Sequence, residues 1–125
     1  MNMKTISLGP FADRCDIQPM PTRDGVEVEL MPHLLNSKGQ GHGGLLMTLL
    51  DEALGMAAKP AGSDIVRLST VDMSIHFIRP AKGRITCKGR LLRSGGSLAF
   101  CEGEVYDENN QVLAKGVATF KLYRE

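Results

Sequence analysis

The chain has 125 residues, a formal net charge of +1 and 23% charged residues, a size that fits one domain over residues 1–125. The balanced charge shows no basic stripe, which argues against nucleic acid as a partner. No apolar run reaches the roughly 20 residues of a membrane span and the N-terminus has no basic-then-apolar leader, so we expect a cytoplasmic protein with no membrane partner.

The pattern of apolar residues predicts one strand, one helix and then four more strands. We expect loosely held residues 1–12, a strand over 26–31, a polar connection over 32–41 and a helix from about His42 to Lys59. Further strands are predicted over residues 67–78, 84–93, 98–106 and 112–122, with turns rich in Gly, Pro, Asp and Asn between them. The short turns imply antiparallel neighbours.

The predicted helix is apolar nearly all round. From Gly43 to Ala58 its only polar side chains are Thr48, Asp51 and Glu52, and such a helix is normally buried on all sides. One flat sheet cannot cover it, so we expect the sheet to curl around it and a second chain to complete the cover. The predicted fold class is therefore α+β, with one long central helix wrapped by a curved antiparallel sheet.

The three cysteines and three histidines show neither a disulfide framework nor metal-ligand spacing. The cysteines are widely spaced, at positions 15, 87 and 101, and form no CxxC pair. We predict three reduced, structural cysteines, no metal and no cofactor.

Two carboxylates on the apolar helix need an explanation. At about 100° per residue Asp51 shares a face with Gly44 and Gly55, whose small size leaves room for a ligand. We interpret Glu52 as a solvated flank residue near Lys59. The same interpretation would suit Asp51 on a generic amphipathic helix.

The start of the helix, at His42-Gly43-Gly44, favours binding of an oxyanion. Glycines in the first turn let another group approach the backbone, and the unpaired N–H groups with the helix dipole attract negative charge. A thioester carbonyl would be polarised there. Paired glycines also suit a tight turn, so the signal lies in their combination with Asp51. His42 is interpreted as a capping or packing residue, because no Ser or Cys nucleophile stands at a recognisable spacing.

Several motifs occur in an order that resembles one family. Asn36-Ser37-Lys38-Gly39-Gln40-Gly41-His42-Gly43-Gly44 is similar to the Asn-x-x-Gly-x-x-His-Gly-Gly of hotdog-fold acyl-CoA thioesterases of the phenylacetate-pathway type, and Leu49-Leu50-Asp51 follows. Residues 71–81 and 96–100 resemble later strands of that family, so the resemblance covers most of the chain.

The resemblance implies a homodimer in which one continuous sheet cradles two helices, with two dimers commonly paired into a tetramer. It implies that the Gly43 N–H binds the thioester oxygen and that Asn36 assists from the same chain. Asp51 of the other chain would act on water or on the carbonyl carbon. Thr70 stands where relatives carry a Ser or Thr that positions the water, although a shift of one residue would select Ser69.

Contacts to the rest of an acyl-CoA substrate are predicted less directly. Some relatives carry a lysine where this chain has Gly96, which leaves Arg79 and Arg93 as candidates for the CoA phosphates. The other candidate substrate contacts are His42, Gly44 and Met47.

The predicted function is hydrolysis of an acyl-CoA to a free acid and CoA. A non-catalytic acyl-CoA binding or sensing protein is the alternative, and a hotdog hydratase ranks last because His42 and Asp51 lack its motif context. The acyl group, and whether Asp51 is base or nucleophile, stay open.

Overall fold

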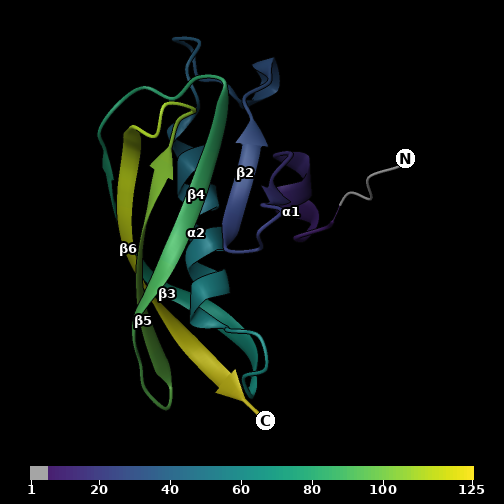
Figure 1. The fold of residues 1–125 in the computed structure, drawn as a ribbon, viewed down its shortest axis with the longest axis vertical. Coiled ribbons are helices and arrows are strands. Elements are labelled where there is room, and N and C mark those ends of the chain that lie inside the picture. The colour runs from purple at the N-terminus through teal and green to yellow at the C-terminus, as the bar shows by residue number, and fades with distance from the viewer. Residues whose placement is uncertain (1–5) are drawn as a thin grey trace.

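A six-stranded antiparallel sheet curls around one long helix, α2 (Gly43–Ala58), in the computed structural model, which describes residues 6–125 (Figure 1). The strands are β1 (Gln18–Pro19), β2 (Gly25–Glu29), β3 (Ile65–Phe77), β4 (Arg84–Ser94), β5 (Leu98–Tyr106) and β6 (Val112–Arg124). Their order in the sheet is β1-β2-β4-β5-β6-β3. This architecture confirms the predicted α+β class and the central helix.

The helix lies directly on β4 and β5 because two glycines face it. A Cβ on Gly89 would lie 2.8 Å from the carbonyl oxygen of Ala53, and one on Gly103 would lie 2.6 Å from Cδ1 of Leu54. Register shifts within the β3–β6, β4–β5 and β5–β6 pairs are of the kind that bends strands and increases twist. Close approach and strand bending together let the sheet wrap the apolar helix.

The strands and α2 fall close to the predicted positions, but three short elements were not predicted. These are α1 (Pro10–Arg14), β1 and the 3-10 helix η1 (Pro32–Leu34), which lies within the predicted polar connection. Residues 1–5 lie outside the described residues. The expectation that residues 1–12 are loosely held is wrong for residues 10–12, which form the first part of α1. That helix buries Ala12, and the Asp13 carboxylate accepts hydrogen bonds from the Ser7 hydroxyl and the Leu8 N–H.

All three cysteines are free, as predicted, and two of them are packed into the core. Burial raises the pKa of the Cys101 thiol to about 11 and raises that of Cys87 further. Thiols with raised pKa values stay protonated and react slowly, which suits a structural role.

Strand β3 forms one edge of the sheet. Within residues 6–125 it pairs only with β6, so its other edge leaves backbone groups unpaired. Val71 and Phe77 on this strand are 60% and 55% exposed. No helix in this same part of the chain is both long and apolar enough to cross a membrane.

Candidate active site

His42 caps α2 with its own side chain. It has an extended backbone (φ −62°, ψ 135°), and its Nδ1 accepts a hydrogen bond of 2.8 Å from the Gly44 N–H. A Cβ on Gly44 would lie only 3.0 Å from that nitrogen, so a larger residue there would push the imidazole from this position. The interpretation of His42 as a capping residue is confirmed.

The Gly43 N–H has no acceptor within residues 6–125. The next two amides in the helix are satisfied, because Gly44 donates to the His42 side chain and Leu45 to the His42 carbonyl. Gly43 lines a pocket of about 370 Å³, and the Phe77 ring lies close by, 3.6 Å from where a Cβ on Gly43 would be. We call this pocket the helix-start pocket; it is lined by Asn36, Gln40, Gly41, Gly43, Leu46 and residues 77–81. An unpaired N–H at a helix N-terminus is suited to stabilise an oxyanion.

Asn36 shapes the rim of this pocket. Its Oδ1 accepts hydrogen bonds from the N–H groups of Lys38 (2.9 Å) and Gln40 (3.1 Å), which closes the turn over residues 36–40. Sequence reasoning missed this structural role, although Asn is typical of such turns. With Oδ1 engaged in the turn, Nδ2 is the donor that Asn36 can offer to a ligand.

Asp51 lies two turns further along α2 and faces β3. The Thr70 hydroxyl donates a 2.6 Å hydrogen bond to Asp51 Oδ1. Asp51 borders a second pocket, of about 250 Å³, which we call the carboxylate hollow. It is lined by Asp51, Glu52, Gly55, Met56, Leu68, Thr70 and Phe120.

A bulge in β3 explains why Thr70, and not Ser69, meets Asp51. Thr70 pairs with Phe120, yet Asp72 pairs with the very next residue of β6, Thr119, so the register shifts between them. The shift breaks the alternation of the strand and lets Thr70 and Asp72 face opposite sides of the sheet.

Glu52 is not the solvated flank residue that we expected. It is half-buried beside Asp51, and burial, followed by the charges of Asp51 and Asp13, raises the pKa of its carboxyl. Its predicted neighbour Lys59 instead donates to the carbonyl oxygen of Val66. The prediction failed because burial, the main cause of the raised pKa, depends on packing that the helix pattern alone does not show.

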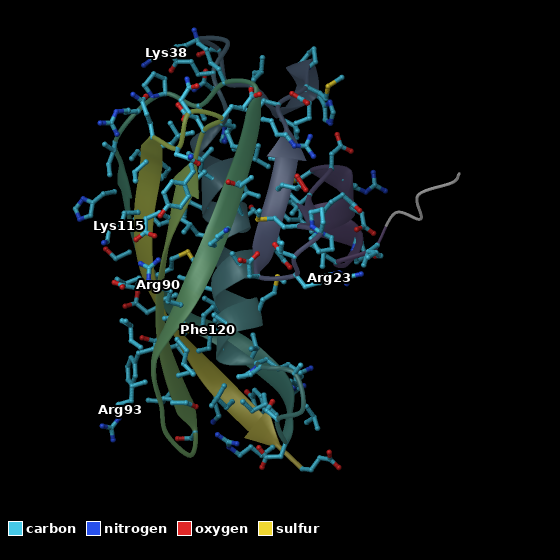
Figure 2. All side chains as sticks on the ribbon, viewed as in Figure 1. Arg23, Lys38, Arg90, Arg93, Lys115 and Phe120 are labelled. Atoms are coloured by element: carbon cyan, nitrogen blue, oxygen red, sulfur yellow. The ribbon has the colours of Figure 1, made fainter. Side chains whose placement is uncertain are left out.

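The structure places the candidate substrate contacts in different surroundings. Arg79 lines the helix-start pocket and donates a 2.6 Å hydrogen bond to the Val112 carbonyl. His42 and Gly44 border a separate pocket of about 280 Å³, and Met47 is 46% exposed. Lys38 belongs to the 36–40 turn at one end of the molecule, and Arg93 lies towards the opposite end (Figure 2).

The two pockets with reactive groups are separate within one chain. They share no lining residue. Gly43 and Asp51 are eight residues apart, which at the rise of a helix is about 12 Å. No three His, Cys, Asp or Glu side chains within residues 6–125 are placed to hold a metal ion. The chain thus offers an N–H donor site and a carboxylate site that cannot reach one thioester together.

Comparison with known proteins places this geometry in a family. Residues 39–114, more than half of the chain, match the thioesterase superfamily. The chain belongs to this superfamily. The match includes the Gly43, Asp51 and Thr70 positions, whereas Asn36 precedes it.

Individual relatives of this chain agree with the match. A Thermoplasma volcanium protein named "Putative esterase TV1331" is 33% identical over 122 residues, which cover 94% of this chain and 91% of that protein. The Escherichia coli K12 protein named medium/long-chain acyl-CoA thioesterase YigI is 28% identical over 97 residues, covering 65% and 61% of the two chains.

A solved structure agrees with the fold. The crystal structure of BH2602 from Bacillus halodurans with CoA has a TM-score of 0.78 and 24% identity, covering 90% of this chain and 75% of that one. The resemblance to hotdog-fold thioesterases is confirmed.

Proposed function

We propose that this protein hydrolyses acyl-CoA thioesters to a free acid and CoA. The observation that carries the proposal is the unpaired Gly43 N–H at the start of α2, in a chain of the thioesterase superfamily. The E. coli relative named as an acyl-CoA thioesterase and the CoA in the B. halodurans crystal support CoA thioesters as the substrate class.

The Gly43 N–H and the Asn36 Nδ2 would stabilise the thioester oxygen. As the carbonyl carbon becomes tetrahedral, negative charge develops on this oxygen, and preorganised donors lower the energy of that state. The positive end of the helix dipole acts in the same direction. The turn closed by Asn36 Oδ1 keeps the donor group in place.

Asp51 would supply the carboxylate of the reaction. Thr70 engages Oδ1, which leaves Oδ2 free to accept a proton from water or to attack the carbonyl carbon. In hydrolysis a C–O bond to the water oxygen forms, the C–S bond breaks, and the sulfur of CoA leaves as thiolate or thiol. Thr70 is a positioning residue in this scheme.

A complete site requires two chains. Gly43 and Asp51 are about 12 Å apart along one helix, too far to act on one thioester. We therefore propose a homodimer in which the helix-start pocket of one protomer, with Gly43 and Asn36, faces the carboxylate hollow of its partner, with Asp51 and Thr70. The unpaired edge of β3 is suited to join the two sheets, since it offers a row of free N–H and C=O groups. Only the family resemblance supports the pairing of two such dimers into a tetramer.

The test is release of CoA. The protein is incubated with a panel of acyl-CoAs and a thiol reagent, with light scattering to give its oligomeric state. We expect saturable CoA release that the Asp51→Asn variant loses. Saturable binding of acyl-CoA without release would contradict hydrolysis and indicate a sensing protein.

A further inference from the structure

Gly55 lies inside α2, one turn after Asp51, where the fold does not require a glycine. A glycine in a helix interior lowers stability relative to alanine. A Cβ at Gly55 would lie 3.7 Å from Leu68 Cδ1 and 3.8 Å from Phe120 Cε1, which are ordinary van der Waals contacts. Alanine would therefore fit, in contrast to Gly89 and Gly103, where the sheet touches the helix.

The missing side chain leaves the carboxylate hollow open. Leu68, which is partly buried, and Phe120, which is fully buried, line it next to Gly55, and Figure 2 shows Phe120 beside the second half of α2. Asp51 and Thr70, joined by their hydrogen bond, supply polar groups to the same hollow. The hollow, of about 250 Å³, thus places a carboxylate next to the apolar side chains of Met56 and Leu68.

We propose that the carboxylate hollow holds the acyl group of the thioester and that Gly55 sets how large that group can be. The inference rests on the proposed function, because it places the carbonyl carbon at Asp51 and the acyl chain against Met56 and Leu68. It assigns the substrate class as thioesters of apolar acids, since the described lining offers apolar side chains to an acyl chain.

Charge restricts the acyl group further. Asp51 and Glu52 both line the hollow, and no Lys or Arg is among its lining residues. A second carboxylate at the end of an acyl chain would lose water and meet like charge there. We expect the protein to discriminate against dicarboxylic acyl groups.

The experiment compares kcat/KM for acetyl-, hexanoyl- and adipoyl-CoA, the last two having six carbons without and with a terminal carboxylate. The parent should prefer hexanoyl-CoA over adipoyl-CoA by at least about tenfold, the effect of one poorly placed charge. Gly55→Ala should lower the hexanoyl-to-acetyl ratio by about 4- to 15-fold, the equivalent of one or two buried methylenes.

Two further variants sharpen this comparison. Met56→Ala widens the same hollow and should raise the hexanoyl-to-acetyl ratio. Gly95→Ala adds the same methyl group in the β4–β5 turn, where its nearest neighbour is the Leu98 carbonyl oxygen at 3.7 Å, and should leave the ratio unchanged. Gly55→Ala should also raise Tm by about 2 to 4 °C, so a lower ratio would not reflect unfolding.

An unchanged ratio in a folded Gly55→Ala protein of parental oligomeric state would overturn the inference. Dissociation of the assembly in the Gly55→Ala variant would also overturn the inference, because it would show that Gly55 contributes to the contact between protomers. If the parent binds acyl-CoA but releases no CoA, the proposed function fails. The acyl site in the hollow is then tested by the ratio of Kd values for hexanoyl- and acetyl-CoA, measured by calorimetry, instead of the ratio of kcat/KM values. Absence of both turnover and binding would overturn both proposals.

Discussion

The start and the middle of α2 offer opposite kinds of chemistry. The helix-start pocket presents a main-chain donor, the Gly43 N–H, whose position follows from helix geometry and from the cap that His42 provides. The carboxylate hollow presents a side-chain acceptor, Asp51, whose position depends on a hydrogen bond from another strand. A backbone donor tolerates most side-chain changes, whereas the carboxylate depends on its own atoms and on Thr70. Four predictions test this division.

The largest effect is expected at Asp51. Asp51→Asn keeps the volume and an oxygen that can accept from Thr70, but removes the base or nucleophile, so kcat should fall by about 100- to 10,000-fold. Steady-state kinetics measures the loss, and circular dichroism checks the fold. Glu52→Gln is the matched control and should change kcat only mildly. If Asp51→Asn hydrolyses acyl-CoA within a few-fold of the parent rate, the role assigned to Asp51 is wrong.

At the start of the helix the side chain of residue 43 should matter little for turnover, and its N–H should matter a great deal. Gly43→Pro removes that hydrogen and should lower kcat by about 100- to 1000-fold, the usual effect of one lost oxyanion donor. Proline suits the first helical position, and the extended His42 before it has the conformation that proline requires. Normal turnover by a folded Gly43→Pro protein would remove this N–H from the mechanism.

Mixing two damaged chains tests whether the two pockets meet across a dimer. Asn36→Asp keeps the oxygen that closes the 36–40 turn but loses the Nδ2 donor, and Asp51→Asn damages the other pocket. In a mixed dimer one site carries both lesions and the other carries none. Random reassortment of equal amounts makes half of the dimers mixed, and each mixed dimer has one intact site. Co-refolding should therefore restore about a quarter of parental activity. If each variant alone has less than about 1% of that activity, the mixture gains at least about 25-fold over either variant.

Each variant refolded alone is the control for that mixture. If both pockets served a site within one chain, the mixture would show only the average of the two residual activities.

The smallest effect is expected at Thr70. Thr70→Val preserves shape but removes the hydrogen bond to Asp51 Oδ1, and we expect kcat to fall about tenfold with little change in KM. Ser69→Ala changes the neighbouring hydroxyl and should have little effect. An equal loss in both variants would indicate that the strand, and not this hydrogen bond, is what matters.

The sequence predicted the long elements because they carry strong periodicity between clear turns. It failed for α1, whose single turn of helix is too short to show a period. Glu52 was misjudged because the helix pattern does not show how far packing buries its carboxyl, which is the main cause of its raised pKa. Gly43 and Asp51 were predicted from helix geometry and the family motif, and their roles stay predictions. The choice of Thr70 over Ser69 needed the structure, because the β-bulge after Thr70 breaks the alternation that sequence reasoning assumes.

The free edge of β3 also makes this strand a reporter of assembly through hydrogen exchange. Strand β5 lies between β4 and β6, so its amides have partners on both sides, whereas about half of the β3 amides point away from β6. In a separated chain those amides would exchange with solvent deuterium quickly, and pairing of two β3 edges would slow them. The deuterium uptake of a single 13-residue segment, Ile65–Phe77, would therefore follow association as protein concentration is varied.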